Sequence, residues 1–280
     1  MIIRQDEIKY EGKVVFERLE IAKNFQRAPK VFFEDEACFL FLSKGAFNFR
    51  TPEQVFSFDE GDGMLAKCGN YFIETDIQKG KTTTETVTVV GAFFYPKIVK
   101  EFFKNDLSLD AFNKPITVSK VHIDNLLRHF VESLNYILDN PSVIDNNIII
   151  NKLKELLILL SKSHKSDSIN DFINSLFSPY EYDFRKIIKE NIYSDLTIKE
   201  FAYLCNMSEA TFKRKFISIY NQSPAKYIQL KKLSLAKQLL KEQSLTISSV
   251  AYDCGFNTPS SFNKAFKKNF GLTPTEYRLS

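Results

Sequence analysis

The side chains with the clearest capacity for chemistry are cationic and amide groups that follow two similar runs in the last third of the chain. Lys213 and Arg214 follow the first run, and Asn263 and Lys264 follow the second. These side chains donate hydrogen bonds to base edges in the major groove of DNA, and arginine can pair with guanine through two bonds. The chemistry they suggest is recognition of a nucleic acid without bond breaking. Arg214 is the first candidate for a guanine contact, and Lys264 is the second.

The sequence has no arrangement typical of a catalytic or metal site. Its only histidines, His122, His129 and His164, lie beyond the segments expected to form strands, whereas a metal-dependent β-barrel needs histidines and a carboxylate clustered on its strands. We interpret His122 and His129 as ordinary polar residues of one helix. Ser/His/Asp arrangements, glycine-rich phosphate loops and paired carboxylates are also missing. We therefore predict that the chain is not an enzyme, binds no metal and uses no cofactor.

The sequence segments that must position the cationic side chains occur as two similar copies. The first copy begins Leu196-Thr197-Ile198 and continues Ala202-Tyr203-Leu204-Cys205, and the second begins Leu245-Thr246-Ile247 and continues Ala251-Tyr252-Asp253-Cys254. The copies align again after a turn, with Ser208, Phe212, Arg214 and Phe216 matching Thr258, Phe262, Lys264 and Phe266. The offset is about 49 residues before the turn and about 50 after it, so the second turn is one residue longer. A repeat of this period indicates a duplicated structural unit.

Each copy has the start and stop signals of two short helices. Thr197 and Glu200 form a capping box, and Ser208 is placed to cap the next helix. In the second copy, Thr258 caps the second helix and Gly271 ends it. A short helix, a tight turn and a second helix make a helix-turn-helix unit, whose second helix enters the major groove of DNA.

Helical phase divides the second helix of each copy into an inner and an outer face. Aromatic residues recur every four positions and must face the core, namely Phe212, Phe216 and Tyr220 in one copy and Phe262, Phe266 and Phe270 in the other. This leaves an outer face made of Ala210, Lys213, Arg214 and Ile217 in the first helix, and of Pro259, Ser260, Asn263, Lys264 and Lys267 in the second. We predict phosphate contacts at Ser208, Asn257, Ser261, Lys267 and Lys268. The alternative is that these charges form only a solvated helix face.

These motifs resemble the AraC/XylS transcription regulators over roughly Asp183 to Arg278. The most specific stretch is Ile247-(x3)-Ala251-(x3)-Gly255-Phe256-(x3)-Ser260-(x)-Phe262-(x3)-Phe266-Lys267-(x2)-Phe270-Gly271-(x2)-Pro274-(x2)-Tyr277-Arg278. The resemblance implies two helix-turn-helix units joined by a long helix, which read two successive major-groove segments. Carried over residue by residue, the family's base-reading positions fall on Ala210, Lys213, Arg214, Ser260 and Lys264, beside which helical phase adds Pro259 and Asn263.

The resemblance also implies partners and a linker. The expected partners are double-stranded promoter DNA and RNA polymerase, with activation more typical of the family than repression. The linker helix is expected from Pro224 to Glu242, about 28 Å at 1.5 Å per residue. Lys232 stands where most members have arginine, and Lys231 stands where an apolar residue is usual. We expect either lysine to lie on the outer face of the helix.

Charge and composition separate the C-terminal third from the rest. The chain has 280 residues and a net charge of +4, and residues 181–280 carry 16 Lys/Arg against 9 Asp/Glu, so the remainder is net acidic. A basic module attached to an acidic one is typical of DNA binding combined with another function. Four cysteines without CxxC spacing, no signal segment and no apolar run near 18 residues predict a cytoplasmic protein that does not enter a membrane. We interpret Cys205 and Cys254, which match in the repeat, as packing residues.

Residues 1 to 95 form the first of three predicted domains and read as short strands. The expected strands are 14–16, 31–33, 38–42, 46–49, 55–58, 64–66, 71–74 and 82–90, which suggest a jelly roll or barrel. By resemblance this is a cupin-like regulatory domain that holds an effector or meets a partner, similar to the ExsA-like branch controlled by a protein. Interior residues and pocket-lining residues cannot be separated by pattern, so no ligand residues are predicted. Eight aromatic residues are expected either to fill the barrel, which we favour, or to line a cavity. They are Phe39, Phe41, Phe47, Phe49, Phe56, Phe58, Tyr71 and Phe72.

Residues 96–178 form the second domain and residues 182–280 the third. Helices are expected at 97–104, 118–138, 147–163 and 182–190. In this family such middle helices usually form a homodimer, although their leucine stripes could equally pack on the barrel. The predicted fold is therefore α+β, with a cupin-like β domain, following helices and an all-α domain of two helix-turn-helix units. The predicted function is a sequence-specific DNA-binding regulator, controlled either by a small molecule or by a protein partner.

Overall fold

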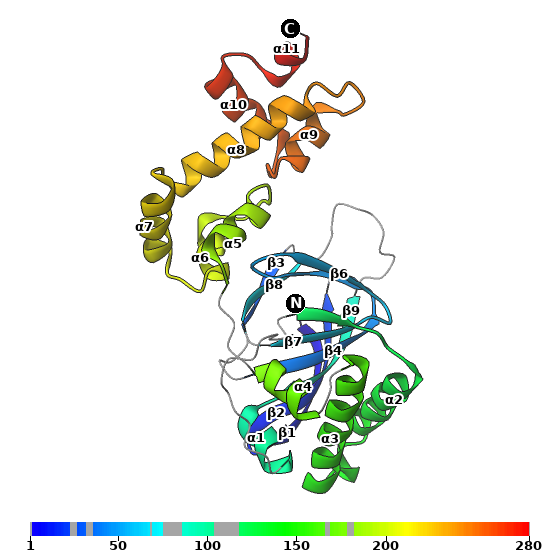
Figure 1. Cartoon of the computed structure of the whole chain (residues 1–280). Helices are drawn as coiled ribbons and strands as arrows, with labels where there is room; N and C mark the ends of the chain where they lie inside the picture. Colours follow the sequence, from blue (N-terminus) through cyan, green and yellow to red (C-terminus); the bar gives the residue numbers. More distant parts are fainter. Residues whose placement is uncertain are drawn as a thin grey trace. The chain divides into compact units, whose positions relative to one another are not determined.

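The computed structural model of the chain describes residues 2–22, 27–31, 36–67, 69–74, 86–103, 118–165, 169–177 and 182–279. The chain divides into two compact units. The N-terminal unit comprises residues 1–51 and 55–181, and the C-terminal unit comprises residues 52–54 and 182–280. Figure 1 shows the β-sheets of the first unit and the helices of the second. The fold is α+β, as predicted.

The N-terminal unit contains two antiparallel sheets. The larger has the order β1 (Ile2–Tyr10), β2 (Lys13–Ala22), β9 (Thr86–Phe94), β4 (Ala37–Lys44), β7 (Gly63–Lys67) and β10 (Val118–Val121). The smaller has the order β3 (Arg27–Val31), β8 (Asn70–Glu74), β5 (Ala46–Arg50) and β6 (Val55–Asp59). Strand β4 pairs with neighbours on both sides and six of its eight residues are buried, as the apolar run from Cys38 to Leu42 requires.

Most predicted strands are present, with shifted ends. Strand β9 begins at Thr86 and continues to Phe94, beyond the predicted end at Val90, because residues 91–94 pair with the first half of β4. The predicted start of that strand at 82–85, and residues 32 and 33 of another, lie outside the described residues. Strand β1 was not predicted because its sequence, IIRQDEIKY, is largely polar and mostly exposed at the edge of the sheet. Antiparallel pairing with β2 holds this segment as a strand, which its own composition does not predict.

The prediction of one helix over 118–138 is wrong. Val118–Val121 forms β10 against β7, and helix α2 (Asn125–Asp139) begins only after Asp124, whose side chain accepts a hydrogen bond from the Leu127 amide at 2.9 Å. Gly63 permits this pairing, since a Cβ there would lie 2.5 Å from Ile123 Cδ1 and 3.1 Å from the Val121 carbonyl. A non-local pairing therefore overrides the helical period of the sequence. His122 consequently lies in the connection before α2 and is not a helix residue.

The helices of this unit are α1 (Pro96–Phe103), α2, a 3-10 turn (Pro141–Val143), α3 (Asn146–Ser163) and α4 (Ile169–Phe177). Helix α2 packs on β1 and β2, where Arg18 of β2 binds Asp6 at 2.7 Å and Asp139 at 2.5 Å. Figure 1 shows α2 and α3 side by side. Their predicted leucine stripes are buried within the unit, namely Leu127, Val131, Leu134 and Leu138 on α2 and Ile149, Leu153, Leu156, Leu157 and Leu160 on α3. These side chains serve the core of the unit and are not a free dimer surface.

The C-terminal unit is all-helical apart from its short segment from residues 52–54. Its helices are α5 (Phe184–Asn191), α6 (Ile198–Leu204), α7 (Glu209–Tyr220), α8 (Pro224–Leu239), α9 (Ile247–Asp253), α10 (Pro259–Phe270) and α11 (Pro274–Leu279). Buried Asn191 donates hydrogen bonds to the Pro52 carbonyl at 2.7 Å and to the Ile187 carbonyl at 2.9 Å. No helix of the described residues is long and apolar enough to cross a membrane.

Candidate nucleic-acid interface

Helix caps set the start of each helix in the two copies. In the first copy, Glu200 accepts from the Thr197 amide at 2.7 Å while Thr197 Oγ1 accepts from the Glu200 amide at 3.3 Å, which completes the predicted capping box. Ser208 Oγ accepts from the Thr211 amide at 3.2 Å and starts α7. The second copy repeats the scheme with Thr246 and Thr258, which accept from the Ser249 and Ser261 amides at 3.0 and 3.2 Å.

The turns of the two copies are closed by matching backbone hydrogen bonds. Asn206 and Gly255 occupy the same position and have left-handed φ values of 52° and 74°. The next residue in each copy, Met207 or Phe256, donates its amide to the carbonyl of Ala202 or Ala251 at 2.9 and 3.0 Å. The additional residue of the second turn is Asn257, which comes after this bond. The duplication seen in the sequence is therefore a duplication of backbone geometry.

The inner faces of α7 and α10 are aromatic, as their spacing predicts. Phe212, Phe216, Phe262 and Phe266 are fully buried, whereas Tyr220 and Phe270 at the helix ends are half-buried. In α7, the rings of Phe212 and Phe216 pack against Phe184 of α5, with centroids 5.6 and 6.3 Å away. These rings fix the rotation of both helices and leave the opposite face to solvent.

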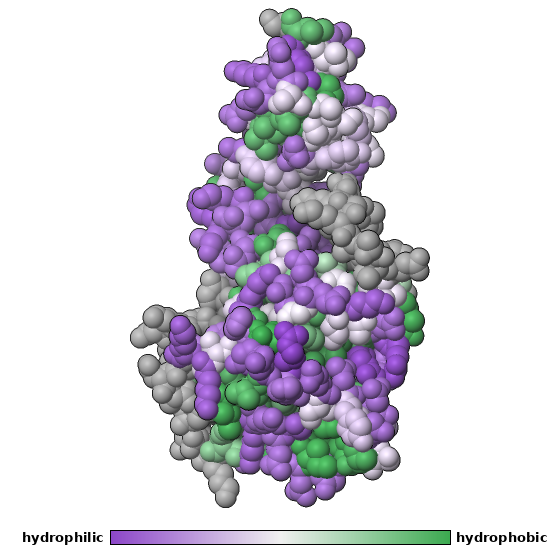
Figure 2. Space-filling view, turned by 90° about the vertical axis from the view of Figure 1, so that its right-hand side faces the viewer, coloured by the Kyte–Doolittle hydropathy of each residue, from purple (hydrophilic) through white to green (hydrophobic). Residues whose placement is uncertain are grey.

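The outer faces of α7 and α10 carry the predicted base-reading residues. Six of the seven are exposed, namely Ala210, Lys213 and Arg214 on α7 and Ser260, Asn263 and Lys264 on α10. Pro259 is half-buried because it occupies the first turn of α10, next to the cap. Ile217 on α7 is also exposed, at 48%. On the face seen in Figure 2, the C-terminal unit presents mainly hydrophilic and weakly polar side chains.

Two cationic side chains of α7 already have partners on their own helix. Lys213 Nζ lies 2.5 Å from Glu209 Oε1, one turn away, and Arg214 Nη2 lies 3.5 Å from Thr211 Oγ1. Both pairs are exposed to solvent, where such interactions are weak and exchange readily for other partners. Neither contact fixes the cation away from the outer face.

The predicted phosphate-contacting residues are exposed but differ in what they do. Ser208 and Ser261 take part in the helix caps, and the Ser261 hydroxyl donates to the Thr258 carbonyl at 2.8 Å. Asn257 lies in the additional position of the second turn, and Lys267 and Lys268 lie in the last turn of α10. Helix N-termini present free amides that attract anions, so the capped starts of α7 and α10 suit phosphate as well as base contacts.

The linker helix α8 differs from its prediction in two ways. It ends at Leu239 rather than at Glu242, which makes it 16 residues long, or about 24 Å at 1.5 Å per residue. Lys231 is exposed, as expected, but Lys232 is only 8% exposed and its Nζ donates to the Gly255 carbonyl at 2.7 Å. The prediction that Lys232 lies on the outer face is therefore wrong. Because Lys231 and Lys232 are adjacent and of the same type, the local sequence does not indicate which of the two is buried.

The matched cysteines are packing residues in the structure. Cys205 and Cys254 are buried at the ends of α6 and α9, and burial raises the pKa of both thiols to about 12. A thiol is reactive only as the thiolate, so neither is poised for redox chemistry at neutral pH. Cys38 is also buried, and Cys68 lies outside the described residues.

The histidines lie apart from one another. His129 is exposed and contacts Glu132 at 3.0 Å, whereas His164 is partly buried with its Nε2 3.1 Å from the Ser119 hydroxyl. Burial lowers the pKa of His164, which favours its neutral form. Within the described ranges, no three histidine, cysteine, aspartate or glutamate side chains are grouped to hold a metal ion.

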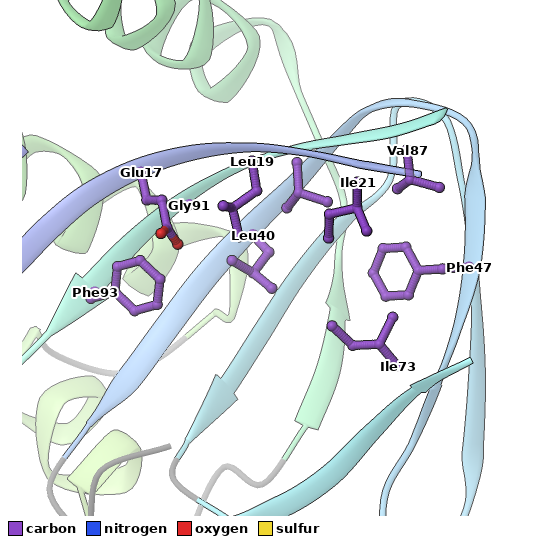
Figure 3. Close-up of a pocket in the computed structure, with 10 residues that line it drawn as sticks. Glu17, Leu19, Ile21, Leu40, Phe47, Ile73, Val87, Gly91 and Phe93 are labelled. Carbon is purple, nitrogen blue, oxygen red and sulfur yellow. The ribbon is translucent and has the colours of Figure 1, made fainter. Parts of the chain in front are cut away.

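A small cavity of about 40 Å³ lies between the two sheets of the N-terminal unit. Figure 3 shows Glu17 and Phe93 toward one end and Phe47 and Ile73 toward the other. Apart from Glu17, which accepts from Gln5 Nε2 at 2.7 Å, the lining is apolar, comprising Leu19, Ile21, Leu40, Phe47, Ile73, Val87, Val89, Gly91 and Phe93. Of the aromatic residues considered for a cavity, Phe47 lines it, whereas Phe49, Phe58 and Tyr71 are buried and fill the interior.

Comparison with known proteins finds a matching family for each of two parts of the chain. The family described as a helix-turn-helix domain matches residues 189–280, and the family described as the ExsA N-terminal regulatory domain matches residues 37–172. The virulence regulon transcriptional activator VirF of Yersinia enterocolitica is 25% identical over 248 residues, which cover 85% of this chain and 88% of VirF. The regulator ExsA of Pseudomonas aeruginosa is 22% identical over 240 residues, covering 85% of this chain and 84% of ExsA.

Among solved structures, ToxT of Vibrio cholerae with a bound unsaturated fatty acid aligns over 95% of this chain and 94% of its own. Its sequence identity to this chain is 14%, and the TM-score is 0.40. The named relatives are transcription regulators.

Proposed function

We propose that this chain is a DNA-binding transcription regulator of the AraC/XylS type with an ExsA-type N-terminal domain, and that it reads DNA in the following way. Helices α7 and α10 each enter a major groove, and their outer faces read two successive segments of one promoter. The observation that carries this proposal is the matching position of one cation on each outer face, since Arg214 and Lys264 occupy equivalent positions and both are exposed. Arg214 pairs with guanine, and Lys264 contacts a second purine.

The linker supports reading by both helices at once. The axial length of α8 is about 24 Å, and each reading helix adds a width of about 10 Å including side chains. These dimensions are compatible with major grooves that repeat every ~34 Å along one face of DNA. Ala210 and Ile217 offer apolar contacts to thymine methyl groups, whereas Ser260 and Asn263 offer hydrogen bonds. The first helix thus reads through charge and apolar surface, and the second mainly through polar groups.

The direct test compares base-reading with phosphate-contacting variants. A duplex selected from random DNA by the full-length protein serves as the cognate site. Replacing Arg214 or Lys264 with alanine should weaken binding to that site by about 1–3 kcal/mol and relax the preference for one or two base pairs. Lys268→Ala is the matched control, since loss of a phosphate contact weakens all sequences alike and lowers the salt slope by about one. Equal loss on every sequence for Arg214→Ala and Lys264→Ala would contradict base reading.

The N-terminal unit supplies the control of this DNA-binding module. The apolar lining of the cavity between its sheets suits a small apolar molecule, and its volume of about 40 Å³ must expand toward the roughly 300–1,000 Å³ of known ligand sites to admit one. The alternative is control by a protein partner, which the resemblance to the ExsA-like branch implies. Native mass spectrometry of the full-length protein from its own host separates the two. A retained small molecule that Leu19→Phe removes supports the first, whereas a co-purifying protein without a small molecule supports the second.

Activation through RNA polymerase and formation of a homodimer complete the proposal. Because the leucine stripes of α2 and α3 are buried, a dimer would use the exposed apolar side chains of these helices, such as Leu126, Tyr136 and Ile158. Tyr136→Glu should then shift the full-length protein toward the monomer in analytical ultracentrifugation. In vitro transcription from the selected promoter, with and without the protein, tests activation. Transcription that falls when the protein is added would indicate a repressor.

A further inference from the structure

Three segments of the C-terminal unit meet around the side chain of Lys232. The first is the linker helix α8, which carries Lys232 itself. The second is the turn between α9 and α10, whose Gly255 carbonyl accepts from Lys232 Nζ at 2.7 Å. The third is the connection from α5 to α6, where the Asp195 carboxylate is close enough to act electrostatically on Lys232. We refer to Lys232, Gly255 and residues 193–195 as the junction.

The junction joins the two helix-turn-helix copies directly. A Cβ atom on Gly255 would clash with the Tyr193 carbonyl oxygen and would lie 2.6 Å from the Ser194 carbonyl oxygen. Residues 193–195 lead from α5 into the first copy, and Gly255 belongs to the turn of the second copy. Only a residue without a side chain lets these two backbones approach so closely. The segment that leads into the first copy therefore approaches the turn of the second copy through backbone atoms, in addition to the connection of the two copies through α8.

Lys232 is well placed to hold this contact. It is only 8% exposed, and its cation also lies 5.8 Å from the centre of the Phe256 ring, next to Gly255. Burial lowers the pKa of its ammonium group, and Asp195 opposes that shift. A buried lysine is rare unless it is paired, because burial removes its hydrogen bonds to water and costs free energy when no protein acceptor replaces them. Neighbouring Lys231 on the same helix is exposed, so burial of Lys232 reflects its particular contacts and not the composition of α8.

We propose that Lys232 is a positioning residue that fixes the orientation of α10 relative to α7, and so sets the spacing of DNA segments that the protein accepts. Its hydrogen bond holds the second turn against α8, at the point where residues 193 and 194 approach Gly255 closely, so the two reading helices meet DNA as one rigid pair. Rigid presentation strengthens binding when the two segments have the matching spacing and penalises any other spacing. This inference rests on the proposed function, since it assumes that both helices read DNA together.

The test measures binding of the full-length protein to three duplexes by fluorescence anisotropy. One is the cognate duplex selected by the wild type, one has a base pair inserted between the two contacted segments, and one retains a single segment in random flanks. For Lys232→Met we expect binding to the cognate duplex to weaken about tenfold, with the preference over the inserted duplex largely lost. Binding to the single segment should stay within about twofold of the wild type, because α7 and α10 keep their own side chains.

Two substitutions serve as controls. Lys231→Met removes a neighbouring charge on the exposed side of α8 and should preserve the spacing preference. Lys232→Arg keeps a donor at the junction and should retain most of the preference. Thermal unfolding of each variant checks that the unit remains folded. If Lys232→Met does not fold, Lys232→Gln, which keeps a shorter donor, replaces it in the same three measurements.

The outcomes separate this inference from the function on which it rests. Wild-type protein that shows no sequence preference would overturn the proposed function itself. A sequence-specific wild type together with a Lys232→Met variant that loses equal affinity on all three duplexes would overturn the positioning role, because the lysine would then act only on general stability or charge. Identical behaviour of Lys231→Met and Lys232→Met would overturn the positioning role as well.

Discussion

The two helix-turn-helix copies have nearly the same backbone but different surroundings. In the first copy, the turn residue Asn206 is exposed, whereas its counterpart Gly255 is buried against residues 193 and 194. Both have left-handed backbones, which asparagine tolerates and glycine adopts without penalty. The first turn could thus keep a side chain, whereas the second could not. The two copies thus differ at the turn residue, where the second copy alone is packed against residues 193 and 194.

The outer faces of α7 and α10 also differ between the two copies. Helix α7 begins with Glu209, which pairs with Lys213, whereas α10 begins with Pro259, which offers no charge. Ile217 on α7 corresponds to Lys267 on α10, so apolar surface in one copy is replaced by charge in the other. The shared inner phenylalanines preserve the fold, and the outer faces differ where DNA would be read.

The strongest test of this comparison substitutes the turn residue of each copy. Gly255→Ala should reduce the free energy of unfolding of the C-terminal unit by about 3 kcal/mol or more, because it adds backbone strain and a clash with two carbonyl oxygens. Asn206→Gly at the matching exposed position should change it by less than about 1 kcal/mol. Denaturant unfolding of the full-length variants measures both. Equal effects at the two turns would contradict the difference in packing.

The caps provide a smaller contrast. Thr197→Ala and Thr246→Ala should each reduce stability by about 0.5–2 kcal/mol, since each removes the acceptor for a helix amide. The loss should be larger at Thr197, because its hydroxyl also donates to Glu200 at 2.8 Å within the capping box. The Thr246 hydroxyl accepts from the Ser249 amide, and the bond from the Ser249 hydroxyl goes to the Thr246 carbonyl, which the substitution keeps. Unfolding of the two variants under one set of conditions gives the difference. A larger loss at Thr246 would mean that the capping box adds nothing.

The smallest expected effect concerns the negative charge of Glu209, which α7 carries and α10 lacks. Glu209→Gln removes the partner of Lys213 and one negative charge next to DNA, so binding to the cognate duplex should strengthen about two- to fivefold. Helix α7 should become less stable by a few tenths of a kcal/mol, because an acidic residue favours a helix N-terminus. Glu242→Gln, in the exposed segment after α8, is the control and should leave affinity unchanged. Unaltered binding by Glu209→Gln would place this end of α7 away from DNA.

The sequence predicts the C-terminal unit well because its structure depends on local signals. Thr197, Ser208 and Thr258 start helices as predicted, and the aromatic residues of α7 and α10 face the core. Capping and helical period involve residues three or four positions apart, which a single sequence displays directly. The outward orientation of Arg214 and Lys264 follows from the same period.

Features that depend on distant pairing could not be predicted in this way. Strand β10 has the apolar spacing of a helix and becomes a strand only because β7 offers an open edge beside Gly63. Strand β1 is polar and is ordered by β2, and helix α4 was not predicted at all. The burial of Lys232 is of the same kind, since its partner is 23 residues away in another turn. For β10, β1 and Lys232, the deciding contact is absent from the local pattern, whereas the buried Phe172, Ile173 and Leu176 of α4 have a helical spacing that the sequence does display.

The length of α8 has a further consequence for how such proteins can change. Each residue of an α-helix contributes a rotation of about 100° as well as 1.5 Å of rise. Inserting or deleting one residue in this 16-residue helix would therefore turn α10 to a different side of the DNA, whereas a substitution leaves the angle intact. A change of about seven residues, or two full turns, would nearly restore the direction while shifting the position by roughly one third of a DNA turn. Insertions and deletions in this lineage are thus expected in the connections, and substitutions in the linker helix.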